Sequence, residues 1–281
     1  MALDYFQIIS FDSVQVYKYL DIGSGKPTVQ ERQEIKHFLI DEVEPDYNFT
    51  VGDFCKRALK AQEEIFSRKK IPFFVGGTGL YIDSFLQGLS EIPPIREGLR
   101  EELKKELDEK GVEALYQDLI KVDINFAVRV ESTDRQRITR GLEVFRSSGK
   151  PLSYFLGKRQ GHESKDTLYL GLYEERDILR EIIDKRVDFM IKAGFLEEVR
   201  SLRSKGYHSK LKSLQSIGYA DINNFLDNKI SWAEAIEKIK TETKRYAKRQ
   251  MTWFKRNKKI NWFRPKEIYQ LKNLVTKWLE V

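Results

Sequence analysis

The sequence predicts an α/β protein built on a parallel sheet, with an all-helical insertion. Three apolar, strand-like runs cover residues 6–10, 37–43 and 71–75. A segment with helical spacing at 51–68 lies between them, an order typical of parallel sheets flanked by helices. Between residues 93 and 161 only helical patterns occur. We therefore expect a core formed by residues 1–92 and 162–281, with a helical insertion at 93–161.

The insertion and the second half of the core show further elements. In the insertion, charged amphipathic spacing predicts helices at 96–110 and 112–120, and a third helix capped by Ser132 or Asp134. After the insertion, residues 167–173 are expected to be a strand that returns to the sheet. A long helix is expected at 179–202, followed by a polar, glycine-bearing joint at 213–220.

Composition narrows the class of protein. The chain has 281 residues, a net charge of +7 and one cysteine, Cys55, so an internal disulfide is excluded and a structural zinc site is disfavoured. No apolar run is long enough to span a membrane, and no secretory signal pattern opens the sequence. A reducing, cytoplasmic setting fits these features. The pI near 9.2 points weakly to a polyanionic partner.

Asp12 follows the first expected strand at the point where a parallel strand ends. Ligands of open α/β sheets bind at that edge, and an aspartate there can serve as a general base, a metal ligand or a ribose contact. The alternative is an ordinary N-cap or turn aspartate, which is common for Asp-Ser after a strand. Local sequence favours the turn role, whereas the rest of the chain favours the functional one.

Two glycine-bearing segments are candidate phosphate sites. Residues 21–28 fail the P-loop pattern, because Leu20 stands at the first glycine position and Pro27 follows the lysine. We interpret them as an ordinary loop, with Lys26 a weak candidate for a phosphate contact. Residues 76–79 follow a strand directly and open a helix, which suits either a phosphate or base contact or a plain tight turn.

Basic residues gather at two places. Arg135, Arg137 and Arg140 lie at a helix start, where the macrodipole prefers anions, so they either grip an incoming phosphate or form a solvated face. Near the C-terminus a basic stripe spans residues 240–259, interleaved with aromatic residues. Like charges four residues apart on a helix destabilise it, so the stripe predicts an anionic partner, with nucleic acid the natural candidate.

Taken together, the motifs resemble the tRNA dimethylallyltransferase (tRNA isopentenyltransferase) family. The matching segments occur in family order over nearly the whole chain, and the ordered set is highly specific. They are 12–17 (Asp-Ser-Val-Gln-Val-Tyr), 21–23 with 26–27, 75–81 (Val-Gly-Gly-Thr-Gly-Leu-Tyr), 136–138 with Arg140, 142–144, 217–219, 245–250 and 252–254.

The resemblance implies a P-loop-NTPase-like parallel sheet with helices on both faces, and a helical insertion that holds tRNA. Asp12 would take the proton from N6 of the adenosine next to the anticodon, because the delocalised N6 lone pair needs a base to become nucleophilic. Arg186 would hold the diphosphate leaving group of dimethylallyl diphosphate. Mg²⁺ is expected on the diphosphate, and no residue is assigned as a metal ligand.

The implied partner is the tRNA anticodon stem-loop, with the target base flipped out of its stack. A monomer without membrane association is expected. The implied tRNA contacts are Asp12, Ser13, Val14, Gln15, Thr78, Arg100, Gln136, Arg137, Ile138, Thr139, Arg140, Gln215, Ser216, Ile217, Gly218, Tyr219 and Ala220.

One departure from the family concerns its P-loop, which precedes the Asp12 position; here eleven residues precede Asp12. We expect a truncated chain with little transferase activity, in preference to a catalytically degenerate tRNA-binding member. Two hypotheses from neighbouring classes stay open: a prenyltransferase acting on free adenine nucleotides, and a nucleotide kinase-like enzyme. Neither of these needs the basic stripe.

Overall fold

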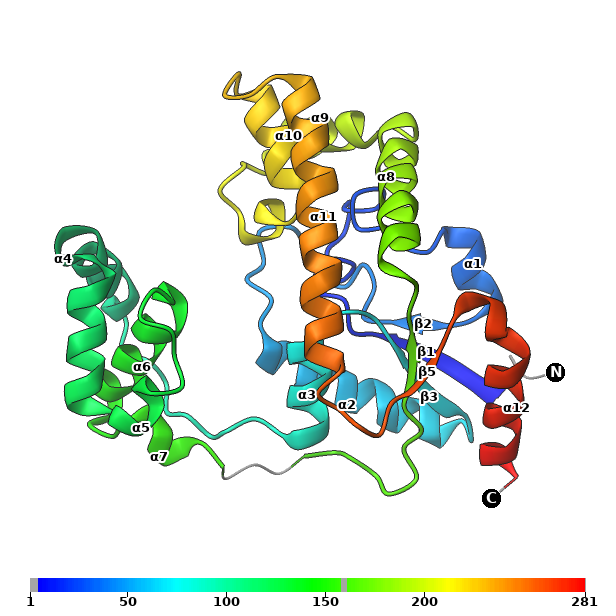
Figure 1. Ribbon diagram of the computed structural model, residues 1–281, viewed down its shortest axis with the longest axis horizontal. Helices are drawn as coiled ribbons and strands as arrows, with labels where there is room; N and C mark the ends of the chain where they lie inside the picture. Colours follow the sequence, from blue (N-terminus) through cyan, green and yellow to red (C-terminus); the bar gives the residue numbers. More distant parts are fainter. Residues whose placement is uncertain (1–4, 158–160, 281) are drawn as a thin grey trace. The chain divides into compact units, whose positions relative to one another are not determined.

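The structure is a computed structural model that describes residues 5–157 and 161–280. The chain divides into two compact units, residues 1–86 with 163–281 and residues 87–162 (Figure 1). We refer to them as the α/β unit and the helical unit. The insertion expected at 93–161 falls inside the helical unit.

The α/β unit contains a three-stranded parallel sheet in the order β2-β1-β3. Its strands are β1 (Phe6–Ser10), β2 (His37–Phe38) and β3 (Ile71–Val75). The register pairs Phe6 with Ile71 and Ser10 with Val75, so β1 and β3 end next to each other. The loops that leave these two strands therefore meet at one edge of the sheet.

Helices and 3₁₀ turns make up most of the rest of this unit. They are α1 (Val29–Glu34), α2 (Val51–Ser67), α3 (Gly79–Gln87), α8 (Arg176–Lys192), α9 (Phe195–Ser204), η2 (Lys212–Gln215), α10 (Tyr219–Leu226), α11 (Trp232–Phe254), η3 (Pro265–Glu267) and α12 (Ile268–Leu279). A continuous apolar core joins the sheet to α2, α3 and α8–α11. Within it, Phe54 stacks on Tyr81 with ring centres 4.8 Å apart, and Phe85 lies 5.0 Å from Phe74.

Three sequence expectations about this unit were wrong. The strand expected at 37–43 ends after Phe38, because Leu39 and Asp41 adopt positive φ angles of 63° and 56° and turn the chain. The long helix expected at 179–202 is divided between α8 and α9, because Gly194 has a φ of 100° and starts a new helix. Left-handed backbone of this kind interrupts both strands and helices.

The third correction concerns the strand expected at 167–173. β4 (Leu170–Leu172) does not join the three-stranded sheet but pairs in parallel with β5 (Asn261–Phe263) in a separate two-stranded sheet. Its neighbours extend the pairing, since Tyr173 N–H donates to Phe263 at 3.0 Å. Gly171 permits this approach, because a Cβ there would lie 2.6 Å from the Trp262 ring.

The helical unit contains α4 (Leu99–Val122), α5 (Ile124–Ala127), α6 (Arg135–Ser148) and α7 (Leu152–Phe155). The expected division near residue 111 is confirmed, because Gly111 has non-helical angles inside α4. This unit has its own core, in which Gly141 lets α6 approach α4: a Cβ there would lie 2.6 Å from Leu119. Across residues 5–157 and 161–280, no helix has the length and apolar character needed to cross a membrane.

Candidate active site

Asp12 lies in the loop that leaves β1, and its carboxylate is held by the backbone. Oδ1 accepts hydrogen bonds from Val14 N–H at 2.8 Å and Gln15 N–H at 3.1 Å. Burial raises the pKa of Asp12, against the lowering effect of these two bonds and of the Arg186 charge. Asp12 is therefore both a turn aspartate and a carboxylate whose basicity is raised by its surroundings.

The glycine turn after β3 lies against the Asp12 loop. Ser13 N–H donates to Thr78 Oγ1 at 3.2 Å, and the Thr78 hydroxyl donates to Ser13 Oγ at 3.3 Å. Gly76 allows this approach, because a Cβ there would lie 2.8 Å from the backbone carbon of Phe11. The predicted strand–turn–helix order at 71–86 is confirmed, and the turn places Thr78 beside Ser13.

Helix α11 covers the same turn with one face. Gln250 Nε2 donates to Gly77 O at 3.0 Å, and Trp253 Nε1 donates to Asp83 at 2.7 Å. Tyr246 lies on the same face, and burial together with the negative charge of Asp12 raises its pKa. Sequence reasoning placed these residues in the stripe and missed this contact. The signal was available, since positions 246, 250 and 253 share one helical face.

Arg186 of α8 extends over the loop at residues 21–26. A Cβ on Gly25 would lie 2.0 Å from Nη2 of Arg186, so the guanidinium rests on the bare backbone of that glycine. Gly25 also has a φ of 60°, which L side chains rarely adopt. The charge of Arg186 also lowers the pKa of Asp12. The structure thus brings together the two residues expected to be catalytic.

Lys26 is not available for a phosphate, so its weak candidacy was wrong. Its side chain is 2% exposed. The ammonium donates to Tyr17 O at 2.9 Å, to Asp21 at 2.7 Å and to Asp41 at 2.6 Å. Because an ammonium group has three N–H donors, these partners use all of them.

The predicted tRNA contacts of the helical unit lie on α4 and α6. Asp134, rather than Ser132, caps α6, as its carboxylate accepts from the Arg137 N–H at 3.0 Å. Arg100 and Arg140 both reach Glu143, at 3.6 Å and 3.0 Å. Gln136 and Arg137 are exposed, the Thr139 hydroxyl bonds to the backbone of its own helix, and Ile138 is buried in the core.

The segment at 215–220 also mixes exposed and buried positions. Gln215 is exposed, and Ser216, Ile217 and Ala220 are half-buried. Gly218 and Tyr219 are buried, and the Tyr219 hydroxyl donates to Glu198 Oε1 at 2.6 Å. A role for Tyr219 in tRNA binding would therefore act through the shape of this segment.

The basic stripe has two different halves. In the middle of α11, Lys240 pairs with Asp188 at 2.7 Å and Lys244 with Asp184 at 2.6 Å. The expectation of an external anionic partner was wrong for these lysines, since acids of α8 neutralise them. Farther along, exposed cations have no acidic partner within the described chain. They are Lys248, Arg249, Lys255, Arg256 and Lys258.

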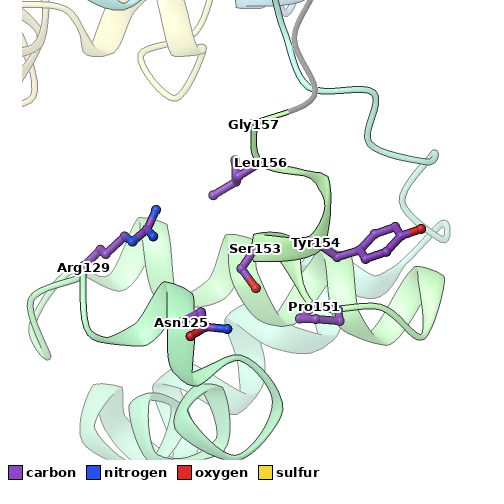
Figure 2. Close-up of a pocket in the computed structure, with 7 residues that line it drawn as sticks. All are labelled: Asn125, Arg129, Pro151, Ser153, Tyr154, Leu156 and Gly157. Carbon is purple, nitrogen blue, oxygen red and sulfur yellow. The ribbon is translucent and has the colours of Figure 1, made fainter.

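A cavity of about 690 Å³ lies in the helical unit, between α5 and α7 (Figure 2). Asn125 and Arg129 line one side, and Ser153 and Leu156 the other. None of the predicted site residues lines this cavity.

The fold and the site define the class: an α/β protein whose candidate catalytic groups lie at the carboxyl edge of a parallel sheet. A family model described as IPP transferase matches residues 15–257. The chain belongs to the IPP transferase family, and the predicted fold class is confirmed.

Several relatives are similar over most of their length. tRNA dimethylallyltransferase 2 of Geotalea daltonii is 46% identical, over 91% of this chain and 79% of that protein. tRNA dimethylallyltransferase of Clostridioides difficile is 41% identical, over 98% of this chain and 89% of that protein. The tRNA isopentenylpyrophosphate transferase structure of Bacillus halodurans matches with a TM-score of 0.70 and 34% identity, over 99% and 89%. A eukaryotic dimethylallyltransferase structure, described as acting on tRNA, matches with a TM-score of 0.78 and 28% identity, over 94% and 68%.

Proposed function

We propose that this protein transfers a dimethylallyl group from dimethylallyl diphosphate to N6 of the adenosine next to the anticodon in tRNA. The observation that carries the proposal is the identity of 41–46% to proteins named tRNA dimethylallyltransferase, over 91–98% of the chain. The charge of Arg186, which acts on the pKa of Asp12, supports it, because transfer needs a base for the amine and a cation for the leaving group.

In the proposed reaction, N6 of adenosine attacks the first carbon of the dimethylallyl group. The new N–C bond forms as the C–O bond to diphosphate breaks, and the N6 proton passes to Asp12. A raised pKa strengthens Asp12 as a proton acceptor. The Arg186 fork suits the charge that develops on the departing diphosphate.

Mg²⁺ is proposed as an ion carried by the diphosphate. Among residues 5–157 and 161–280, no group of three His, Cys, Asp or Glu side chains is arranged to hold a metal. Mg²⁺ typically binds through substrate phosphates with few protein ligands, which fits this donor set. When bound, it would neutralise phosphate charge; the residues of the chain supply orientation and proton acceptance.

Each unit has its own proposed tRNA-binding surface: the exposed cations between residues 248 and 258 in the α/β unit, and the exposed arginines of α4 and α6 in the helical unit. Lys248 and Arg249 lie on α11, which covers the glycine turn, and Lys255 follows its last residue, so RNA phosphates bound there would lie near the Thr78 loop. Asp12 and Arg186 both belong to the α/β unit, so one chain carries the complete pair, and we expect it to act as a monomer.

The test is to incubate the protein with tRNA, dimethylallyl diphosphate and Mg²⁺, and to measure adenosine mass after nuclease digestion. One dimethylallyl group on the adenosine next to the anticodon, and none when that position is replaced by guanosine, would support the proposal and contradict the sequence-based expectation of little activity. AMP in a parallel reaction tests the hypothesis of a free-nucleotide substrate. Binding of tRNA without any transfer would instead favour a degenerate tRNA-binding protein.

A further inference from the structure

Glu198 of α9 fills an anion-binding turn in the 21–26 loop. Its carboxylate accepts three consecutive backbone N–H groups, from Asp21 at 3.0 Å, Ile22 at 2.7 Å and Gly23 at 3.2 Å. Successive N–H groups that converge in this way form the concave site that binds phosphates in other proteins. In this loop the anion is an internal carboxylate.

Tyr219 of α10 completes the site from the other side. Its hydroxyl donates to Oε1 of Glu198 at 2.6 Å, and its side chain is fully buried. Hydrogen bonds to an ionised carboxylate are short and about twice as strong as neutral ones. A Cβ on Gly23 would lie 2.2 Å from the Phe195 ring and 2.6 Å from Tyr219, so helices α9 and α10 press directly on the loop.

The other end of the 21–26 loop contacts Arg186 and Gln15, two residues of the candidate active site. The guanidinium of Arg186 rests on Gly25. Gln15 Nε2 donates to Gly25 O at 3.3 Å, and Gln15 Oε1 accepts from Ser10 Oγ at 3.0 Å. The Gln15 backbone N–H in turn donates to Asp12. A shift of the loop would therefore move Arg186 and Gln15 relative to Asp12.

We propose that Glu198, supported by Tyr219, is a positioning residue for prenyl transfer: it holds the 21–26 loop so that Arg186 receives the diphosphate beside Asp12. The inference rests on the proposed function and names no new contact with substrate. It also explains how Tyr219 could affect prenyl transfer without contacting tRNA.

The first experiment compares wild type with Glu198→Gln. The carboxamide replaces one acceptor oxygen by an NH₂ group, which faces N–H or O–H donors and cannot accept their hydrogen bonds. We expect the KM for dimethylallyl diphosphate and the Kd for inorganic pyrophosphate to rise on the order of tenfold to 10²-fold, since misplacing a positioned group by about 1 Å can cost about 10²-fold. The Kd for tRNA should not change.

Glu197→Gln is the matched control, because Glu197 is the preceding residue of the same helix turn and pairs at the surface with Arg200 at 3.5 Å. Measurements are made below the unfolding temperature of every variant. If Glu198→Gln only lowers that temperature and leaves both diphosphate constants at the wild-type value, the positioning role is wrong and Glu198 is structural.

A second arm tests whether the effect passes through Arg186. In an Arg186→Ala background, Glu198→Gln should weaken pyrophosphate binding no further, whereas independent residues would give additive losses. Gly25→Ala offers a route that leaves Glu198 intact, since its Cβ would collide with Arg186. If Glu198→Gln does not fold, Gly25→Ala is measured in its place, and its Kd for pyrophosphate should rise in the same way.

The two proposals fail in different ways. Absence of prenyl transfer by the wild type would overturn the proposed function, and pyrophosphate calorimetry would still decide the role of Glu198. Transfer by the wild type together with wild-type diphosphate constants in a folded Glu198→Gln variant would overturn the positioning role alone. Additive losses in the double variant would also contradict it.

Discussion

In the α/β unit, Arg186 rests on the backbone of Gly25 without an ion pair in the described chain, whereas in the helical unit Arg100 and Arg140 share the carboxylate of Glu143. The charge of Arg186 acts on Asp12, whose pKa is raised by burial. The difference shows two uses of charge. The α/β unit keeps a few groups partly desolvated, where burial alters their pKa values, and the helical unit pairs these two arginines with an acid while leaving them partly exposed to solvent.

Asp12→Asn tests the chemical side of this comparison and should have the largest effect. The carboxamide oxygen can still accept from Val14 and Gln15, so the loop is preserved while the base is lost. We expect turnover to fall by on the order of 10²–10⁴, as for other lost general bases. Steady-state kinetics and a tRNA binding assay should show lost turnover with unchanged affinity.

The pH dependence of kcat/KM provides a second test of the role of Asp12. Because burial raises the pKa of Asp12, kcat/KM should fall with decreasing pH at values above the ordinary aspartate value of 3.8. Asp46→Asn, an exposed site in the same unit, should keep both the rate and this profile. Wild-type turnover in Asp12→Asn would remove Asp12 from the mechanism.

The two halves of the α11 stripe provide a second contrast. Replacement of Lys248, Arg249 and Lys255 by alanine should weaken tRNA binding and flatten its log–log salt dependence by about 0.7–0.9 for each phosphate that is no longer neutralised. Titrations over a range of salt concentrations measure this slope.

Lys240 and Lys244 are the matched control, because Asp188 and Asp184 already neutralise them. Alanine at both positions should leave the salt slope unchanged and lower thermal stability slightly. An equal change of slope in the two variants would mean that the whole stripe binds RNA.

In the helical unit, alanine at both Arg137 and Arg140 should act on binding alone. We expect the salt slope of tRNA affinity to fall by about 0.7–0.9 for each phosphate that these arginines neutralise, with kcat unchanged at saturating tRNA. Lysine at both positions keeps the charges and should keep the slope. Unchanged affinity and slope in the alanine variant would identify this face as merely solvated.

The smallest expected effect concerns stability. Arg146 and Lys110 contact Glu106 at 2.6 Å and 2.7 Å and lower the pKa of its carboxyl from 4.5 to about 2. A lowered pKa adds stability above pH 4.5 that is lost as the pH falls toward 2. Arg146→Ala should therefore destabilise the helical unit by about 0.2–1 kcal/mol at neutral pH and by less in acid.

Thermal or denaturant unfolding between neutral and acidic pH measures this difference. For Lys104→Ala, an exposed change on α4, the difference in stability from wild type should not depend on pH. A constant difference at all pH values would indicate that Arg146 contributes by packing.

The sequence by itself determined the elements and their order. Apolar runs and helical spacing predicted β1, β3 and α2 closely, and the position of Asp12 after β1 marked the carboxyl edge of the sheet. These features are local, because alternation, capping and turn chemistry depend on residues within a few positions of one another. The ordered motifs added the family, which the matching family model confirmed.

The partners of individual side chains were decided only by the tertiary structure. Lys26 was a weak candidate for a phosphate contact but donates to three neighbours. Lys244 was expected to face an external anion but pairs with Asp184, sixty positions away in the sequence. Glu198 carries no sequence signal, yet it holds the loop whose Gly25 contacts Arg186 of α8. The sequence shows which residues are charged. Whether a charge is neutralised depends on which helix faces pack together, and that packing joins segments distant in the sequence.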